Sequence, residues 1–288
     1  MNHRARYIVP LPGGRSLALG GRTLVMGILN VTPDSFADGG LHVSADAAVA
    51  HGRAMIAAGA DIIDVGGEST RPGAEQVDAD EERRRVLPVV EQLAASGVVV
   101  SIDTTKAVVA REAIARGAAI VNDISGLQFE PALGRVVADG GAALVLMHTR
   151  GRPAGMAERA EYGNVVDEVA AELREALARA AEAGVPADAV ILDPGIGFAK
   201  RPAHSYAAMA GLAALAALGR PILCGPSRKS FLTEALGTRE PAGRDWGTAA
   251  AVAASVLLGA HIVRVHAVAA LMDVVRVADR IRAASGEE

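Results

Sequence analysis

Residues that can bind ligands or catalyse reactions recur at one kind of place in this chain, the end of a short apolar run. Six such runs end at Asn30, Asp64, Asp103, Asn122-Asp123, His148 and Asp193. Two more lead to Ser227-Arg228-Lys229 and to Arg264, with His266 just beyond. Strands that are covered on both faces have no polar alternation of their own, so core packing explains these residues poorly. The pattern predicts a polar site where the ends of the runs meet.

The acidic and amide residues of this set are suited to a ligand that is rich in hydrogen-bond donors. A buried carboxylate without a partner is costly, so it needs a cation, a metal ion or such a ligand. An amide such as Asn122 beside a carboxylate such as Asp103 or Asp193 matches a heterocycle that carries an amino group and ring N–H donors. Asp64 and Asp123 are the better candidates for another role, that of capping the helices that follow.

The cationic residues of the set lie late in the chain and are suited to an anionic group. Lys229 comes just after the seventh apolar run. Loops after the last two strands of (β/α)8 barrels often bind phosphate. Arg264 and His266 alternate along the eighth run and so share a face, and arginine also stacks on planar rings. We interpret these cations as part of a binding site rather than as purely structural residues.

Two loops that follow the first two runs could cover or complete this site. Residues 30–40 are polar, end in two glycines and have Phe36 in their middle. That composition is typical of a mobile lid and equally of a surface turn. In residues 66–73, Arg71 and the Thr70 hydroxyl could bind an anion or a carboxylate, the alternative being a solvated arginine.

The elements that would position these residues alternate regularly along the chain. Predicted helices precede a glycine and a new apolar run in four places, at residues 45–58, 80–95, 106–116 and 165–183. A Gly-Ala-x-Ile junction at Gly59, Gly117 and Gly259 favours a glycine C-cap followed by a strand. This alternation predicts an α/β fold, a (β/α)8 TIM barrel, whose strand ends converge on the face that holds the active site. The rival fold, a doubly wound sheet, would need a Gly-rich phosphate loop that the ends of the first two runs lack.

The 288 residues are predicted to form a single domain with a short N-terminal extension. A barrel of this type takes about 250 residues. We place the extension at residues 1–22 and the barrel at residues 23–288. Residues 15–19 and 22–24, joined by Gly20-Gly21, predict a hairpin that could plug the lower end of the barrel.

Composition and net charge limit the classes of binding partner and the cellular compartment that we expect. The formal net charge of −4 argues against a nucleic acid held by bulk electrostatics, and the most apolar late stretch, residues 248–263, is too short and interrupted for a membrane span. We therefore expect small-molecule substrates, no nucleic acid and no membrane. The single cysteine, Cys224, favours a reducing, cytoplasmic setting. We interpret Cys224 as a small buried hydrophobe, with a catalytic nucleophile as the alternative.

The histidines and carboxylates show no tight metal-ligand spacing such as His-Glu-x-x-His. A structural zinc site is therefore not expected. A Mg²⁺ ion held mostly by substrate phosphates and one protein oxygen would leave little trace in a sequence. Asn30 could supply that oxygen.

Seven segments, read together, resemble the signature blocks of the dihydropteroate synthase family. They keep their order and spacing from about Leu24 onward, at residues 30–36, 64–73, 101–104, 122–124, 193–198, 227–229 and 264–266. The first two, Asn-Val-Thr-Pro-Asp-Ser-Phe and Asp-Val-Gly-Gly-Glu-Ser-Thr-Arg-Pro-Gly, are together highly specific. The resemblance implies a transferase that condenses 6-hydroxymethyl-7,8-dihydropterin diphosphate with p-aminobenzoate, with Mg²⁺, and releases diphosphate. The family's enzymes are usually homodimers, and sulfonamides mimic p-aminobenzoate.

The resemblance also implies a role for each site residue. The pterin would be held deep in the barrel by Asp103, Asn122, Asp193 and Lys229. The diphosphate would be held by Arg264, which also stacks on the pterin, by His266, and by Asn30 through the metal. The p-aminobenzoate site would be shaped by Thr70, Arg71, Phe198 and Ser227, with Phe36 and Pro72 from the two loops.

The mechanism that the resemblance implies is a dissociative C–O cleavage. Asp103, Lys229 and Arg264 are then the predicted catalytic residues, and Asp103 would stabilise the cationic pterin methylene. No covalent nucleophile is needed.

One residue departs from the family pattern. The family commonly has an aspartate after the Arg-x-His triplet, and this chain has Ala267. If that aspartate orients the histidine in relatives, His266 is held differently here.

Two other functions stay open. One is a pterin-dependent methyltransferase domain of the same barrel superfamily, which needs neither a diphosphate site nor the Thr70-Arg71-Pro72 loop. The other is a non-catalytic paralogue that binds a pterin.

Overall fold

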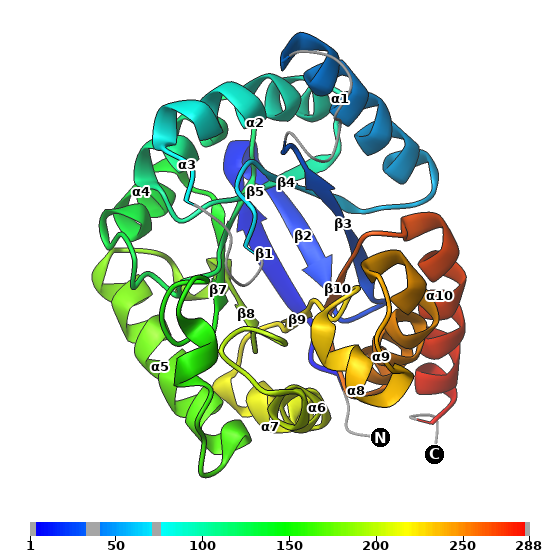
Figure 1. The fold of residues 1–288 in the computed structure, drawn as a ribbon. Coiled ribbons are helices and arrows are strands. Elements are labelled where there is room, and N and C mark those ends of the chain that lie inside the picture. The colour runs from blue at the N-terminus through cyan, green and yellow to red at the C-terminus, as the bar shows by residue number, and fades with distance from the viewer. Residues whose placement is uncertain (1–3, 33–40, 71–75, 286–288) are drawn as a thin grey trace.

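The computed structural model describes residues 4–32, 41–70 and 76–285, without the side chains of residues 41–44. Within these residues, eight parallel strands form a barrel with the helices outside it (Figure 1). The strands are β3 (Leu24–Asn30), β4 (Ile62–Gly66), β5 (Val99–Asp103), β6 (Ile120–Asp123), β7 (Ala143–Met147), β8 (Val190–Asp193), β9 (Leu223–Cys224) and β10 (Ile262–Val265). Neighbours follow the order β8-β7-β6-β5-β4-β3-β10-β9, and a parallel bridge between Leu192 and Ile222 closes the ring. The predicted (β/α)8 barrel is confirmed.

The helices of the described part surround this barrel. They are α1 (Leu41–Ala57), α2 (Ala79–Ala94), α3 (Ala107–Ala115), α4 (Ala132–Gly140), α5 (Val165–Glu182), α6 (Pro202–Ala210), α7 (Leu212–Leu215), α8 (Thr233–Leu236), α9 (Asp245–Leu257) and α10 (Val268–Ala284). Short 3₁₀ segments are η1 (Pro12–Gly14), η3 (Met156–Arg159), η4 (Ala187–Ala189), η5 (Ala216–Leu218), η6 (Ser230–Leu232) and η7 (Pro241–Arg244). None of the helices described is both long and apolar enough to cross a membrane.

The repeated Gly-Ala junctions end helices in the way the sequence predicts. Gly59, Gly117 and Gly259 have φ angles of 103°, 102° and 104°, which glycine adopts readily and other residues rarely do. The N–H of the alanine after each glycine donates to the carbonyl five residues earlier, at 2.9 Å in all three cases. This is the Schellman geometry that satisfies the last carbonyls of a helix before the next strand begins.

Gly117→Ala is expected to destabilise the fold more than Gly259→Ala. Both substitutions place a side chain at a positive φ, which costs about 1–3 kcal/mol. At Gly117 a Cβ atom would also lie 2.7 Å from the Cβ atom of Ala94, whereas at Gly259 the nearest atom is 4.0 Å away. Urea unfolding of the two variants measures both losses. Equal losses would show that the contact with Ala94 relaxes without cost.

The N-terminal hairpin lies one strand earlier than predicted. Strands β1 (Tyr7–Leu11) and β2 (Arg15–Leu19) pair antiparallel around η1, where Gly13 and Gly14 both have φ of 73°. The prediction that Gly20-Gly21 makes the turn is wrong. Gly20 instead passes so close to the incoming chain that a Cβ atom would lie 2.3 Å from the Ala5 carbonyl oxygen. Glycine therefore marks a close approach there rather than the turn itself.

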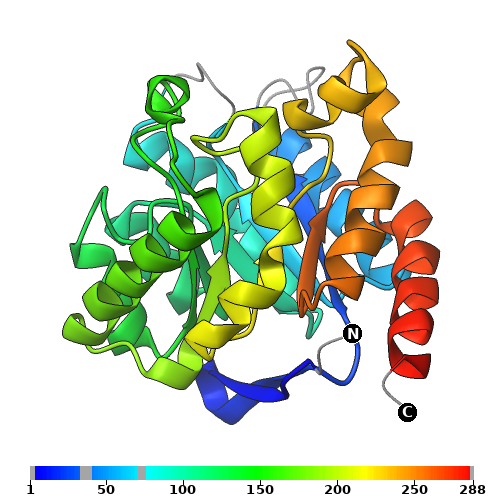
Figure 2. The same ribbon diagram turned by 90° about the horizontal axis from the view of Figure 1, so that it is seen from below.

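The hairpin plugs the lower end of the barrel, as predicted (Figure 2). Val9, Leu11, Leu17 and Leu19 are buried against the inward-facing residues at the lower ends of the strands. A second and larger apolar cluster fills the space between the strands and the surrounding helices. Apolar side chains thus fill the lower part of the barrel, and the polar residues that end its strands lie at the opposite end.

Candidate active site

Asn122 and Asp123, the last two residues of β6, have different hydrogen-bond partners. The reason is that successive side chains point to opposite faces of a strand. Asn122 is buried, and its amide donates to Asp64 Oδ2 at 3.0 Å across the barrel end. Asp123 accepts hydrogen bonds from the N–H groups of Ser125 at 2.8 Å and Leu127 at 2.6 Å. The prediction that Asp123 caps the following helix is wrong, because Asp123 orders a turn directly after β6 and helix α4 begins only at Ala132.

Asp64 was predicted to cap a helix, and this prediction is wrong. It lies two residues before the end of β4, fully buried, and its Oδ2 accepts from both Asn122 and the Arg264 Nε, the latter at 2.6 Å. Its backbone pairs in register with Ser101 on β5. Among the described residues, Asp64 Oδ1 and Ser101 Oγ have no hydrogen-bond partner although both are buried. Polar atoms buried at this depth need a further polar partner, which a bound ligand or an ordered water supplies.

Arg264 joins the ends of β4, β5 and β10. Its Nη2 donates to Asp103 Oδ2 at 2.7 Å while its Nε donates to Asp64. Burial raises the pKa of Asp103 to about 7, although the nearby Arg264 charge works against this rise. Burial works against the guanidinium too, but Asp64 and Asp103 together hold the pKa of Arg264 above its usual range. One cation therefore holds two carboxylates, and a proton can be exchanged at Asp103 near neutral pH.

Asp193 and Lys229 interact through their charges at the barrel end, where each affects the pKa of the other. Asp193 is buried at the end of β8, where its Oδ1 accepts from the Gly195 N–H at 2.7 Å. Burial raises its pKa, and the charge of Lys229 opposes the rise. Lys229 Nζ donates to the Ile196 carbonyl at 2.5 Å and lies 4.6 Å from the centre of the Phe198 ring. Loss of solvent lowers the pKa of Lys229 to about 8, against Asp193, which raises it.

Ser227 contacts His266, which directly precedes Ala267, the position where this chain lacks the aspartate that is common in the family. The Ser227 hydroxyl contacts His266 Nδ1 at 2.9 Å and also accepts from the His266 N–H at 3.1 Å. The histidine ring is thus oriented by a hydroxyl from the loop after β9. Arg228, which belongs to the predicted cationic set, does not join the site, because Asp245 binds its guanidinium at 2.7 and 2.8 Å.

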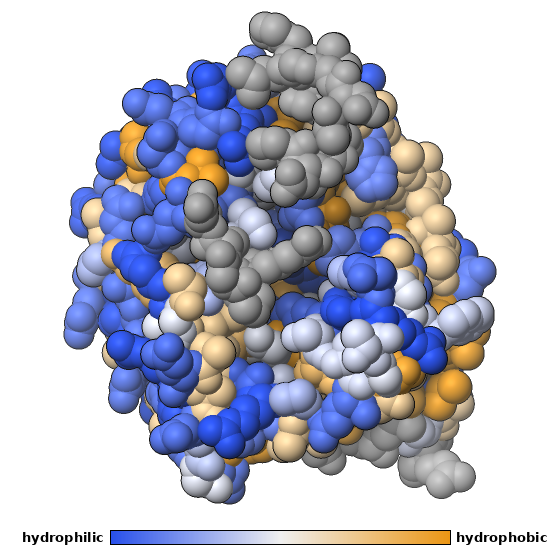
Figure 3. Space-filling model, in the orientation of Figure 1, coloured by the Kyte–Doolittle hydropathy of each residue, from blue (hydrophilic) through white to orange (hydrophobic). Residues whose placement is uncertain are grey.

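The remaining predicted site residues divide into two groups. Asn30 is half-buried at the end of β3, in register with Gly66, and Thr70 is half-buried in the loop after β4. Phe36, Arg71 and Pro72 lie outside the described residues. Hydrophilic residues dominate the rim of the barrel around these strand ends (Figure 3).

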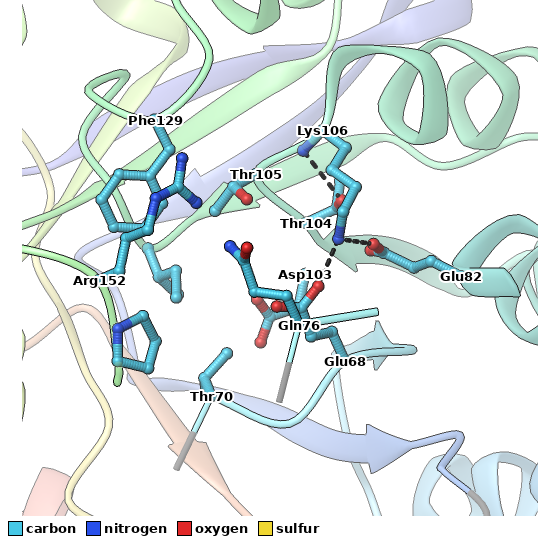
Figure 4. A pocket seen from close by; sticks show the side chains of 12 residues that line it. Glu68, Thr70, Gln76, Glu82, Asp103, Thr104, Thr105, Lys106, Phe129 and Arg152 are labelled. Atoms are coloured by element: carbon cyan, nitrogen blue, oxygen red, sulfur yellow. Dashed lines mark hydrogen bonds and ion pairs between the residues drawn. The ribbon is translucent and has the colours of Figure 1, made fainter. Parts of the chain in front are cut away.

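A cavity opens beside Asp103, between the loops that follow β4, β5, β6 and β7 (Figure 4). Thr70, Gln76, Thr105, Phe129 and Arg152 line it. At its inner edge Lys106 forms ion pairs with Glu68 and with Glu82, whose carboxylate is almost fully buried on α2.

This pair of Lys106 and Glu82 was missed from the sequence. Both residues lie in segments that read as helical and charged, so they look like solvated positions there. The available signal is that Lys106 lies two residues after the strand-end block, residues 101–104, that contains Asp103.

Cys224 is not a nucleophile of this site. It is fully buried on β9, accepts a hydrogen bond from Ser255 Oγ at 3.3 Å, and burial raises its pKa to about 12. A thiol with such a pKa has almost no thiolate near neutral pH, so the interpretation as a small hydrophobe is confirmed. Across the residues that the structure describes, no group of three His, Cys, Asp or Glu side chains could hold a metal ion.

Comparison with known proteins assigns this geometry to one family. The family model described as pterin binding enzyme matches residues 26–266. The dihydropteroate synthase of Synechocystis sp. is 45% identical over 274 residues, covering 94% of this chain and 95% of that relative. The structure of Xanthomonas albilineans dihydropteroate synthase with 4-aminobenzoic acid matches with a TM-score of 0.89 and 43% identity, over 96% of this chain and 99% of that one. That of the Yersinia pestis enzyme with a sulfonamide drug matches with a TM-score of 0.88 and 40% identity, over 96% and 99%.

Proposed function

The chain belongs to the dihydropteroate synthase family of pterin-binding transferases, and on that premise we propose the reaction and the role of each residue. The substrates are 6-hydroxymethyl-7,8-dihydropterin diphosphate and p-aminobenzoate, and the products are 7,8-dihydropteroate and diphosphate. The observation that carries this proposal is the ring of buried polar groups at the barrel end, in which Asp64 Oδ1 and Ser101 Oγ have no hydrogen-bond partner among the described residues.

The pterin is proposed to lie over this floor. Its amino group and ring N–H groups are donors, which suit the carboxylate of Asp193 and the amide oxygen of Asn122, while the Lys229 ammonium suits a ring acceptor. Asp193 and Asn122 are almost fully buried, so each hydrogen bond they form is made away from water. A dry, polar floor discriminates strongly between ligands, because a ligand that lacks a donor leaves a buried acceptor unpaired.

The diphosphate is proposed to lie near Arg264 and His266. Mg²⁺ is proposed to arrive with the substrate and to be held mostly by its phosphate oxygens. Among the described residues, no cluster of three His, Cys, Asp or Glu side chains could hold a metal ion. A single amide oxygen, that of Asn30, and the phosphate oxygens match the way Mg²⁺ is usually shared with phosphates. When bound, the ion would neutralise part of the diphosphate charge.

The chemistry is proposed to be a dissociative C–O cleavage. As diphosphate leaves, positive charge develops on the pterin methylene, and the ionised Asp103 stabilises it. The amine of p-aminobenzoate then attacks that carbon and loses a proton. Phe198, Ser227 and Thr70, with Phe36, Arg71 and Pro72, are proposed to hold the p-aminobenzoate. The Xanthomonas albilineans enzyme with 4-aminobenzoic acid and the Yersinia pestis enzyme with a sulfonamide support the choice of this second substrate.

The deciding experiment mixes the purified protein with both substrates and Mg²⁺ and follows diphosphate and dihydropteroate together. Equimolar formation of both, lost on addition of EDTA, is the expected result. Diphosphate alone would mean a working pterin site without a p-aminobenzoate site. If a folded protein forms neither product, the proposal is overturned, and binding of a methylfolate would then favour the methyltransferase.

The family resemblance also leads us to propose a homodimer. Size-exclusion chromatography with light scattering tests it.

Pterin binding is expected to be tightest between about pH 7 and about pH 8. Asp103 is proposed to contact the pterin beside Asn122 and Asp193, so it must be ionised to accept from a ring N–H, and its pKa is about 7. Lys229 must be protonated, and its pKa is about 8. Below the first value and above the second, affinity should fall by about tenfold per pH unit. The dissociation constant of 6-hydroxymethyl-7,8-dihydropterin, measured by fluorescence from about pH 5 to about pH 10, tests this. In Lys229→Arg the alkaline limb should vanish, and a flat wild-type profile would contradict both assignments.

A further inference from the structure

The chain contains 26 arginines and only three lysines, and all three lysines follow strands at the polar end of the barrel. Lys106 follows β5, Lys200 follows β8 and Lys229 follows β9. A lysine offers a compact ammonium with three converging donors, whereas the arginine guanidinium is a planar fork. In a chain that otherwise uses arginine, these are the positions where that difference matters. Lys106 and Lys229 have partners described above, and Lys200 has no role so far.

All three donors of Lys200 are used, and each goes to a different acceptor. Its Nζ lies 2.8 Å from His148 Nδ1, 3.1 Å from the Gly195 carbonyl and 3.2 Å from the Phe198 carbonyl. Lys200 is 8% exposed, so these contacts replace water. Burial lowers its pKa to about 7, against Asp193, which raises it. Only the protonated amine has the three donors that this arrangement needs.

The lysine is itself held in place by a buried pair. Because His148 Nδ1 faces the ammonium, it accepts, and the imidazole proton lies on Nε2, which donates to Glu172 Oε2 at 3.0 Å. Burial lowers the pKa of His148 to about 4, so the ring stays neutral in this tautomer. Glu172, on α5, also accepts from Arg150 Nε at 2.9 Å. A chain of contacts thus runs from helix α5 to the loop after β8.

Residues 195–199, the segment whose carbonyls Lys200 binds, also carry part of the proposed substrate site. The Gly195 N–H donates to Asp193, the Ile196 carbonyl accepts from Lys229, and the Phe198 ring lies under the Lys229 ammonium. Its backbone is unusual, with φ of 66° at Gly195, 78° at Gly197 and 46° at Ala199. Glycine adopts such φ angles readily, whereas at Ala199 the conformation persists only where surrounding contacts hold it.

We propose that Lys200 is a positioning residue, which ties the Gly195 and Phe198 carbonyls from below so that Phe198 and Lys229 face the substrates. This inference rests on the proposed function of the site. It predicts a specific defect when the ammonium is lost: the segment relaxes, and ground-state binding of p-aminobenzoate weakens while the chemical step is largely kept. Arginine should not replace this lysine, because its fork cannot place three donors around one point.

The test compares Lys200→Met and Lys200→Arg with a control, Tyr162→Phe. The Tyr162 hydroxyl donates to the Ala199 carbonyl at 2.9 Å, so the control removes one hydrogen bond from the same segment but none from the tripod around Lys200. Both lysine variants are expected to raise the KM for p-aminobenzoate by about 10- to 100-fold, with kcat within about threefold of wild type. The control should keep KM within about twofold. Equal effects in control and lysine variants would overturn the proposal.

Hydrogen exchange separates this inference from the proposed function. In Lys200→Met the peptide that spans residues 193–200 should exchange faster than in wild type, whatever the enzyme catalyses. Unchanged exchange in that peptide with an active wild-type enzyme would overturn the positioning role alone. Faster exchange in the variant with an inactive wild type would overturn the proposed function alone.

A second pair of variants covers the case in which Lys200→Met does not fold. His148→Ala removes one acceptor of Lys200 and its link to Glu172, and is expected to raise the KM for p-aminobenzoate by about threefold to tenfold. His148→Gln keeps one acceptor and one donor on a neutral side chain, so it should restore much of the loss. Wild-type KM in His148→Ala would overturn the proposal.

Discussion

Arg264→Leu is expected to lower turnover by about 100- to 1,000-fold and to destabilise the fold, because both partners of this arginine are buried carboxylates. Asp64 is 0% exposed and Asp103 is 9% exposed. Removing one partner of a buried ion pair costs about 3–5 kcal/mol. The measurements are the rate of dihydropteroate formation and the free energy of unfolding in urea.

The pH dependence of that variant's stability has a definite sign. The pKa of Asp103, already raised to about 7 by burial, should rise further without the arginine. A carboxyl whose pKa is higher in the folded state than in the unfolded chain favours folding when protonated. The free energy of unfolding should therefore fall as pH rises from the pKa of an unfolded aspartate, about 4, to the pKa of Asp103 in the folded state. In wild type this fall should end near pH 7, whereas in Arg264→Leu it should continue above pH 7.

Arg22→Leu is the matched control for Arg264→Leu. Arg22 also forms a two-pronged ion pair, with Asp61, but at the plugged end of the barrel, and its side chain is 60% exposed. Its loss should cost less than about 1 kcal/mol and leave turnover unchanged. If Arg264→Leu behaved like this control, Arg264 would have no part in the site.

Lys229→Ala is expected to weaken binding of the pterin diphosphate by about 10- to 100-fold while the melting temperature changes little. The ammonium donates to the Ile196 carbonyl and lies over Phe198, and its side chain is only half-buried, so it supports the site more than the core. A hydrogen bond to a charged group contributes about 1.5–3 kcal/mol, and a loss of this size weakens binding by about 10- to 100-fold. Titration of the pterin diphosphate in the presence of Mg²⁺ measures the effect.

Lys229→Arg distinguishes the charge of Lys229 from its shape. The variant keeps a cation but replaces the compact ammonium by a planar fork, so partial recovery of affinity is expected. Wild-type affinity and kinetics in Lys229→Ala would remove this residue from the pterin site.

Much of the candidate site could be predicted before the structure, because the carboxyl ends of parallel strands must meet at one end of a barrel. Asp103, Asn122, Asp193, Lys229 and Arg264 all come together there, from five different strands or the loops that follow them. Local chemistry was equally predictable at the glycines that end helices, since their role depends only on backbone geometry within six residues.

The sequence by itself therefore determined the barrel, the end at which the polar strand-end residues gather and most members of the candidate site. Only the tertiary structure decided which side chains pair. Asp64 binds Arg264 rather than a helix end, Arg228 pairs with Asp245, and Lys200 donates to the Gly195 carbonyl. The physical reason is that pairing depends on the direction in which a side chain leaves its strand or loop and on distances across the barrel, between residues as far apart as 64 and 264. A one-dimensional pattern records residue types and strand ends but neither of these quantities.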